Sequence, residues 1–287
     1  MVTRRCTQRQ HLLRPDKETN NAFIYCLAIA AHRYDIEVVN FIQMSNHLHN
    51  VIFDRHGNAP AFYEHFHKLL AKCMNALRGR WENFFSSEQV SVVRLETYEA
   101  LIDKLTYVAT NPVAAGLVER ASDWPGASGL AALTTGKPLR ARRPEHFFAE
   151  DSALPEVVEL TLRVPWELGE HDRVVDDVVA RVARAEHMLA EKRKITGSTV
   201  QGRYAVLRKS WRDVPDTREP RRTLNPRFAA RNLGARLDAI QRFRDFVRDY
   251  RIARKALLAG EPTVFPYGTY WLRRHVAVDM MPLEKLN

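Results

Sequence analysis

The feature that most constrains the fold is a pair of apolar, β-branched segments separated by a short polar break. Residues 37–42 and 47–53 are rich in valine, isoleucine and phenylalanine, and Met44-Ser45-Asn46 lies between them. Parallel strands need a crossover of a dozen or more residues, so a break this short joins antiparallel strands. We therefore predict a β-hairpin and, with it, an antiparallel sheet.

The segments on either side of this hairpin complete a recognisable order of elements. That order is strand, helix, strand, strand, helix, strand, helix, which predicts an α+β fold with helices packed on one face of an antiparallel sheet. We expect the last helix to end before Pro112, because proline disfavours helix at the residue before it. The flanking strands are predicted at 1–6 and 90–95, and the helices at 20–33, 61–80 and 97–110.

A change in composition predicts a boundary near residue 150. Residues 1–150 form one predicted domain, and residues 151–287 form a mostly helical C-terminal extension. Within the extension we predict long helices at 174–194 and 233–258, an arginine-rich stretch between them and a strand-like aromatic run at 265–274. The extension either binds DNA or serves as a structural brace that packs on the core, and the sequence leaves both roles open.

The charge of the chain favours an anionic partner, and nucleic acid is the usual one. Lysine and arginine number 44 against 34 acidic residues, a net charge of +10. Residues 1–150 carry 18 basic and 15 acidic side chains (+3), and residues 151–287 carry 26 and 19 (+7), so the extension holds most of the excess. A merely solvated basic surface is the alternative. The sequence has neither an apolar stretch of membrane-spanning length nor an apolar leader, so we expect a cytoplasmic protein without membrane contact.

The sharpest local feature is His47-Leu48-His49, in the second segment of the hairpin. In a strand, residues two apart point to the same face, so both imidazoles project together while Leu48 points into the core. Two neutral imidazoles side by side form half of a metal site and leave positions open for phosphate oxygens or water. A chain with 11 histidines also contains such a pair by chance, and this alternative stays open on spacing alone.

Tyr107, near the end of the third predicted helix, is the second candidate. At about 100° per residue, Leu101 and Leu105 mark an apolar face, and Tyr107 falls well away from it. Asn111 would lie beside Tyr107, one turn later. Tyr98 falls on the apolar face and is predicted to be a packing residue. The alternative for Tyr107 is an ordinary surface tyrosine.

Taken together, these features resemble a known family. Met44-Ser45-Asn46 followed by His47-Leu48-His49 resembles the motif of the HUH single-tyrosine transposases of insertion sequences, in which two histidines flank a hydrophobic residue. The run from Tyr107 to Val113, YVATNPV, looks more narrowly like the REP-associated tyrosine transposase branch. Trp81-Glu82 and Trp124-Pro125 are also similar to that branch. The resemblance covers about residues 1–150.

This resemblance implies a ferredoxin-like core, with the histidines on a central strand and the tyrosine on a helix across from them. It implies cleavage of single-stranded DNA through a 5′-phosphotyrosine on Tyr107, assisted by Mg²⁺ or Mn²⁺. His47, His49 and Asn111 would then be the metal ligands. The implied partner is single-stranded or hairpin DNA, with the protein nucleoid-associated and either a monomer or a dimer. The chain departs from the family in starting within the first strand.

Two alternatives from other classes remain open. One is a non-catalytic, regulatory DNA-binding protein on the same scaffold, and the other is a nuclease that uses water with Tyr107 as a bystander. Under any of these readings we expect arginines of the first strand and of the stretch 203–231 to contact DNA phosphates, with Tyr204 and Trp211 as stacking platforms. The arginines singled out are Arg4, Arg5, Arg208, Arg212, Arg221 and Arg222.

Overall fold

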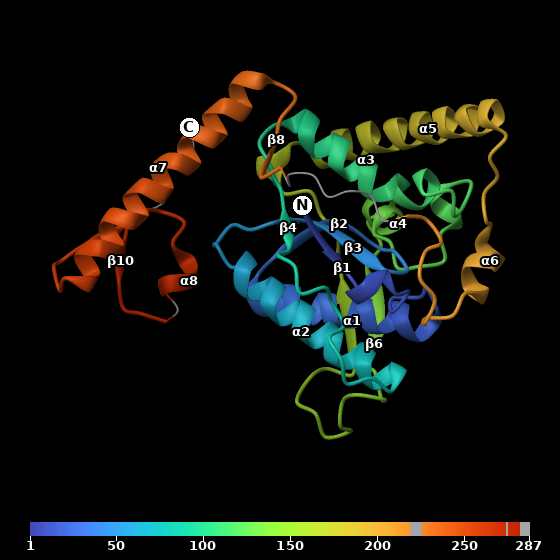
Figure 1. Ribbon diagram of the computed structural model, residues 1–287, viewed down its shortest axis with the longest axis horizontal. Coiled ribbons are helices and arrows are strands. Elements are labelled where there is room, and N and C mark those ends of the chain that lie inside the picture. Colours follow the sequence, from blue (N-terminus) through green and yellow to red (C-terminus); the bar gives the residue numbers. More distant parts are fainter. Residues whose placement is uncertain (219–225, 274, 282–287) are drawn as a thin grey trace.

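The computed structural model describes residues 1–218, 226–273 and 275–281 (Figure 1). At its centre is a four-stranded antiparallel sheet in the order β2-β3-β1-β4. The predicted hairpin is confirmed, and its second strand has the predicted bounds. The strands are β1 (Val2–Arg5), β2 (Glu37–Gln43), β3 (His47–Phe53) and β4 (Ser91–Val92).

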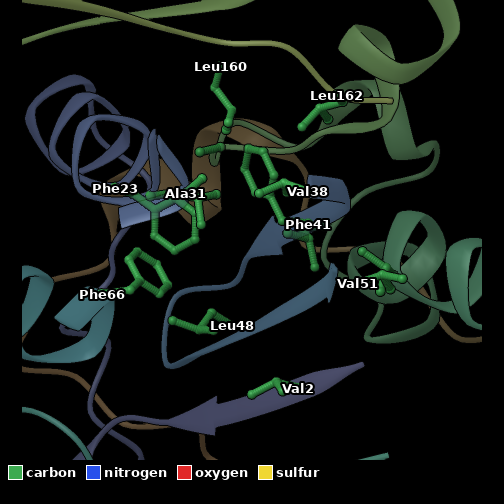
Figure 2. Close-up of a cluster of buried hydrophobic side chains, with 14 of the residues drawn as sticks. Val2, Phe23, Ala31, Val38, Phe41, Leu48, Val51, Phe66, Leu160 and Leu162 are labelled. Atoms are coloured by element: carbon green, nitrogen blue, oxygen red, sulfur yellow. The ribbon is translucent and has the colours of Figure 1, made fainter. Parts of the chain in front are cut away.

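Two helices cover one face of this sheet. α1 (Lys17–Tyr34) follows β1, and α2 (Ala59–Arg78) follows β3. The chain order β-α-β-β-α-β with this strand order is the predicted ferredoxin-like, α+β arrangement. Figure 2 shows the apolar contact, in which Phe23 of α1 and Phe66 of α2 approach the sheet. α1 begins earlier than expected, because the Asp16 side chain accepts a hydrogen bond from the Thr19 backbone and caps the helix there.

A third helix, α3 (Tyr98–Ala114), lies on the opposite face of the sheet. Phe41 and Ile42 are consecutive in β2 and so point to opposite faces; Phe41 contacts Phe23 of α1, whereas Ile42 pairs with His49, whose ring contacts α3. Helices therefore lie on both faces, whereas the sequence predicted them on one. α1 and α2 connect strands of the ferredoxin-like sheet and share one face, whereas α3 follows the last strand of the sheet and covers the other face.

α3 also continues through Pro112, where the sequence predicted its end. Proline removes one backbone donor and crowds the preceding turn. Here the lost bond would run from residue 112 to the Val108 carbonyl, and the ring of Pro112 is buried, so packing against the core offsets the loss. The backbone amides of Ala115 and Leu117 bond to the carbonyls of Asn111 and Pro112 and close the helix end. Asn111 is consequently part of a regular helix.

The hydrophobic core does not stop at residue 150. β6 (Leu139–Arg142) pairs with β7 (Val157–Leu160), and both contact α1. α5 (His171–Thr196) packs along α3, and its apolar side chains belong to the same buried cluster as those of the sheet. Figure 2 shows Leu160 and Leu162 in that cluster. The first part of the predicted extension is thus built into the core.

Two further regions follow α5. Residues 201–217, which we call the strap, run along the core at the end of the sheet where β2 turns into β3, and they include α6 (Arg203–Arg208). Residues 226–273 and 275–281 belong to an arm around α7 (Leu233–Leu258). This helix projects from the body in Figure 1 and has the predicted bounds. The aromatic run near the end was predicted to be strand-like, but Tyr270–Arg273 is helical (α8).

The remaining elements are short. The predicted strand at 90–95 divides into β4 and β5 (Arg94–Leu95), and β5 pairs with β8 (Phe228–Ala229), which joins the arm to the segment before α3. Within the arm, β9 (Val264–Phe265) pairs with β10 (Asp279–Met280). The others are η1 (Thr7–Arg9), η2 (Ala121–Asp123), α4 (Leu130–Thr135) and η3 (Trp166–Leu168).

Candidate active site

The two histidines of the motif lie together on the sheet face that carries α3. Alternation along β3 sends His47 and His49 to this face and Leu48 to the other, as predicted. Their ring centroids are 4.9 Å apart. His49 is almost fully buried and His47 is half-buried, so one imidazole is inside the protein and the other is at its edge.

Each imidazole is oriented by a hydrogen bond at Nδ1. Thr3 of β1 lies directly across from His49, and its Oγ1 is 2.7 Å from His49 Nδ1. Asn46, which precedes His47, places its Oδ1 2.7 Å from His47 Nδ1. A carbonyl oxygen only accepts, so His47 carries its proton on Nδ1. In both rings Nε2 is left to face α3, as in metal sites whose histidines are held by a second partner.

The α3 helix brings Tyr107 and Asn111 to the same place. They are four residues apart and therefore share one side of the helix. The Tyr107 ring lies 5.2 Å from that of His49, and the Asn111 Nδ2 lies 3.3 Å from His49 Nε2. Asn111 also lies close enough to the other two rings to raise the pKa of His47 and to lower that of Tyr107, so it is the common neighbour of all three rings. Tyr107 is 44% exposed, so part of its side chain is accessible from outside.

The second tyrosine of the helix behaves differently. Tyr98 packs against the core and donates a hydrogen bond to Asp177 of α5 at 2.6 Å. The sequence-based separation of the two tyrosines, one for packing and one displayed away from the core, agrees with these positions.

The electrostatics of the site keep both imidazoles neutral. Burial, followed by the Arg5 charge, lowers the pKa of His47 to about 4. Burial also lowers the pKa of His49 well below its usual value, and His47 and Lys104 add to that effect. Burial raises the pKa of Tyr107, while its hydrogen bond with Asn111 partly opposes the rise. At neutral pH the site therefore presents free imidazole nitrogens and a protonated phenol.

These residues fit a divalent cation that takes several ligands from its substrate. Across residues 1–218, 226–273 and 275–281, no three side chains among histidine, cysteine, aspartate and glutamate gather as a metal site. The donor set on offer is two neutral imidazoles with convergent Nε2 atoms and the Asn111 amide. A cation held in this way keeps open positions for phosphate oxygens and water.

The arginines predicted to contact DNA fall into four groups. Arg5 lies across from His47 on the same sheet face and borders the site. Arg4 points to the other face, where it donates to the Glu88 carbonyl and lies over the Phe85 ring. Arg208 and Arg212 are exposed on the strap. Arg221 and Arg222 lie outside the described residues.

Sequence reasoning missed three residues of the site. Thr3 could be found only from the register of β1 against β3, which the sequence does not specify. Asn46 stood within the quoted motif, but nothing in the pattern indicated its bond to His47. Lys104, whose Nζ is 5.6 Å from the centre of the Tyr107 ring, lies one turn before the tyrosine, and helical spacing was the available signal.

Comparisons with known proteins add little to this geometry. No protein-family model and no curated protein matches the sequence. A solved structure, described as that of a REP-associated tyrosine transposase bound to a REP hairpin, is 15% identical and aligns with a TM-score of 0.39. The alignment covers 59% of this chain and 88% of the other. A likeness at this level carries no argument about family or activity. In the described part of the chain, no helix combines the length and apolar character needed to span a membrane.

Proposed function

We propose that this chain cleaves and rejoins single-stranded DNA, with Tyr107 as the nucleophile and a divalent cation at His47, His49 and Asn111. The observation that carries the proposal is that α3 places Tyr107 and Asn111 against the paired imidazoles. The Tyr107 ring lies 5.2 Å from the His49 ring, the Asn111 Nδ2 lies 3.3 Å from His49 Nε2, and the His47 and His49 rings are 4.9 Å apart. Neither a packing role nor plain DNA binding requires these four side chains in one place. The activity would be that of a transposase, which moves or processes DNA segments.

The proposed chemical step is a transfer of one phosphodiester. The Tyr107 oxygen attacks the phosphorus, the bond from phosphorus to the 3′ oxygen breaks, and the 5′ phosphate becomes linked to tyrosine. The phenol proton passes to solvent, and the departing 3′ oxygen gains a proton. Because the phosphotyrosine keeps a phosphodiester bond, a free 3′ hydroxyl can reverse the step without ATP.

The side chains of the site and the cation would have different roles in this step. A phenol is a poor nucleophile while protonated, and burial makes Tyr107 harder to ionise. When bound, a divalent cation polarises the scissile phosphate and offsets the charge that develops on its oxygens. The two imidazoles and the amide would hold that cation, and because they supply few oxygen ligands, we expect Mn²⁺ or Mg²⁺ to bind more tightly once DNA phosphate is present.

Unpaired DNA suits this site better than a duplex. His49 is buried beneath Tyr107, so the scissile phosphate must come close to the protein surface and turn its oxygens inward. A single strand can bend in this way, and basic and aromatic side chains bind such strands by charge and stacking. The strap supplies exposed examples in Arg208, Arg212 and Tyr204, and the core supplies Trp81, which is almost fully exposed.

Covalent trapping tests the proposal directly. The full chain is incubated with a library of labelled single-stranded hairpins and Mn²⁺, then denatured. We expect a labelled protein band that survives denaturation in the wild type and is absent in Tyr107→Phe. Tyr98→Phe is the matched control on the same helix and should keep the band.

The outcome also separates the competing functions. A nuclease that uses water would release cut DNA without a covalent band, and a binding protein would shift the DNA without cutting it. A band that persists in Tyr107→Phe would remove Tyr107 from the role of nucleophile.

A further inference from the structure

The turn that carries His47 is enclosed by the N-terminal segment, residues 6–14. Within the turn, the Met44 amide donates to the His47 carbonyl at 2.9 Å. The Cys6 amide donates to the Asn46 carbonyl at 2.8 Å, and the Leu13 amide donates to the Ser45 carbonyl at 2.9 Å. The backbone of the turn is thus bonded on both sides before any side chain contributes.

The Asn46 side chain is fixed at both of its polar atoms. Its Oδ1 lies 2.7 Å from His47 Nδ1, and its Nδ2 donates to the Arg9 carbonyl at 3.2 Å. The second bond determines which way the amide faces, because only the nitrogen can donate to a carbonyl. Oδ1 is therefore presented to His47, and the ring must keep its proton on Nδ1 and its lone pair on Nε2.

The carbonyl that orients Asn46 comes from an unusual piece of backbone. Gln8 and Arg9 have φ angles of 49° and 59°, in the left-handed region that side chains other than glycine rarely occupy. Such conformations persist only where the surroundings hold them. Here the Arg9 guanidinium donates to Thr217 of the strap, to the carbonyl at 2.7 Å and to the hydroxyl at 3.0 Å.

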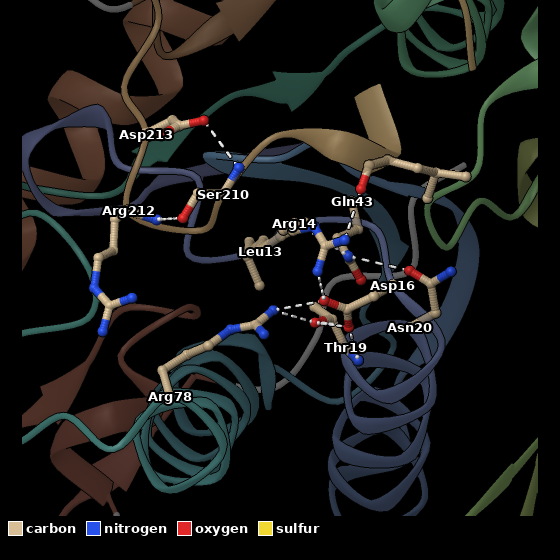
Figure 3. A network of polar contacts seen from close by, with 11 residues as sticks. Leu13, Arg14, Asp16, Thr19, Asn20, Gln43, Arg78, Ser210, Arg212 and Asp213 are labelled. Carbon is tan, nitrogen blue, oxygen red and sulfur yellow. Dashed lines mark hydrogen bonds and ion pairs between the residues drawn. The ribbon is translucent and has the colours of Figure 1, made fainter. Parts of the chain in front are cut away.

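The strap itself is anchored to the same N-terminal segment. Arg14 donates to the Leu207 carbonyl at 2.6 Å, and the His11 amide donates to the Asp213 carbonyl at 2.9 Å. Figure 3 shows Arg14 and Asp16 below the strap, whose Ser210 and Asp213 bond to each other. The contacts therefore form three layers, from the strap to residues 6–14 and from these to the β2–β3 turn.

We propose that Asn46 is a positioning residue that aims His47 Nε2 at Tyr107 and Asn111, and that the strap holds Asn46 in place through Arg9. The C-terminal region thereby sets the geometry of a site to which none of its described side chains contributes. That His47 Nε2 serves to bind a cation rests on the proposed function. The positioning of the ring by Asn46 does not depend on it.

The positioning is tested on the metal-free full chain by nitrogen-15 NMR of labelled histidines, whose ring nitrogens differ in shift with and without a proton. We expect His47 in the wild type to carry its proton on Nδ1. Asn46→Ala should shift His47 toward a mixture of the two tautomers. Asn46→Asp keeps an acceptor oxygen and should retain the wild-type form, which covers the case in which the alanine variant fails to fold.

The same spectra contain their own controls. His49 is held by Thr3, so its signals should stay unchanged in Asn46→Ala and should change in Thr3→Val, which leaves His47 as it was. Asn21→Ala controls for loss of an amide, because Asn21 is half-buried and bonds to the Arg142 backbone far from the site. A wild-type His47 with its proton on Nε2, or an Asn46→Ala variant with unchanged His47 signals, would refute the positioning role.

The part played by the strap is tested by two substitutions at Arg9. Both remove the guanidinium that holds Thr217. Glycine adopts the left-handed backbone without cost, whereas alanine, like arginine, adopts it only where the surroundings hold it. We expect Arg9→Ala to shift the His47 tautomer and Arg9→Gly to leave it nearly unchanged. If Arg9→Ala leaves the His47 signals as in the wild type, the strap has no part in the positioning.

Calorimetry with Mn²⁺ links the positioning to the proposed function. Removing the partner of a metal-binding histidine typically lowers metal affinity about 10- to 100-fold, and we expect Asn46→Ala to fall in this range. A tautomer change without any effect on Mn²⁺ affinity would leave the positioning standing and count against the metal site. An Asn46→Ala variant that shows neither the tautomer change nor the loss of Mn²⁺ affinity would overturn the inference.

Discussion

The two faces of the central sheet are stabilised by different interactions, although neighbouring residues of one strand contribute to both. Leu48 and His49 are neighbours in β3 and both are buried, yet Leu48 meets the aromatic side chains of α1 and α2, whereas His49 meets Thr3, Tyr107 and Asn111. One face is held by apolar contact. The other buries polar groups and satisfies them by hydrogen bonds, at a cost in stability that serves the geometry of the site.

The same contrast recurs in β1. Arg4 and Arg5 are neighbours that point to opposite faces, and each lies near a histidine on its own side. After burial, the Arg4 charge is the second cause that lowers the pKa of His67, and the Arg5 charge is the second cause that lowers that of His47. His67 stacks among Tyr63 and Phe85, without an acceptor for its Nε2 in the described part of the chain. A lowered pKa is therefore common to both histidines, and it is their partners that differ.

The largest expected effect is on the polar face. His49→Ala removes one of the two imidazoles proposed to hold the cation, so the covalent DNA adduct should become undetectable and Mn²⁺ affinity should fall, as measured by gel and by calorimetry. The free energy of unfolding should change less than in the apolar variant described next. Asn111→Ala should be milder, because an amide oxygen is a weaker ligand than imidazole. Full adduct formation by His49→Ala in the presence of a chelator would end the metal-site hypothesis.

The neighbouring residue should show the reverse pattern. Leu48→Ala leaves a cavity between the sheet and its two core helices, and such changes cost about 2–5 kcal/mol of the free energy of unfolding. Denaturant titration measures this loss. Under conditions in which the variant is still folded, it should form the covalent adduct, because the site lies on the other face. A folded Leu48→Ala protein without adduct would show that the two faces are not independent.

Lowering the pH should reduce the free energy of unfolding through histidines on both faces, but it should affect adduct formation only through the face that carries His47. His47 and His67 have pKa values of about 4 and about 3 in the folded protein, below the ordinary value of 6.5. Between pH 6.5 and pH 4 these histidines bind protons in the unfolded chain but not in the folded protein. The free energy of unfolding therefore decreases as the pH falls through 6.5 toward 4. Denaturant titrations at pH 7 and pH 4.5 should show this loss, with a smaller one in His47→Ala and in His67→Phe.

The control for this pH dependence is the reaction itself. His67→Phe should leave the pH profile of adduct formation unchanged, since His67 lies across the sheet from Tyr107. A profile that follows His67 would contradict the assignment of the reactive face.

Much of this contrast could be predicted from the sequence, because it depends on alternation. The bounds of β3, the shared face of His47 and His49 and the off-core position of Tyr107 follow from the periods of strand and helix. The partners of these residues could not be predicted. Thr3 depends on strand register, and Asn46 depends on a carbonyl in a left-handed loop. These contacts join segments that are far apart in the chain, and local pattern carries no information about them.

The misjudged elements have the same origin. The helix passes through Pro112 because tertiary packing outweighs the local preference against it. The core includes residues beyond 150 because β7 pairs with β6, a long-range contact that composition does not reveal. The aromatic run near the end reads as a strand, but Tyr270–Arg273 is helical. In the first two cases a contact outside the local segment decided the structure.

The smallest expected effect concerns the strap, which extends the polar face beyond the sheet. Arg208 and Arg212 are exposed, and neither guanidinium has an ion-pair partner within the described ranges; that of Arg212 lies 4.2 Å from the Trp211 ring centre. Replacing both with alanine should weaken binding to single-stranded hairpins and reduce the slope of log affinity against log salt by about 0.7 for each lost phosphate contact. Fluorescence anisotropy at several salt concentrations measures the slope. The matched control is Arg140→Ala with Lys194→Ala, which removes the same charge from side chains already paired with Glu159 and Glu191. If both double variants lower the slope equally, the basic strap acts only through net charge and is no DNA-binding surface of its own.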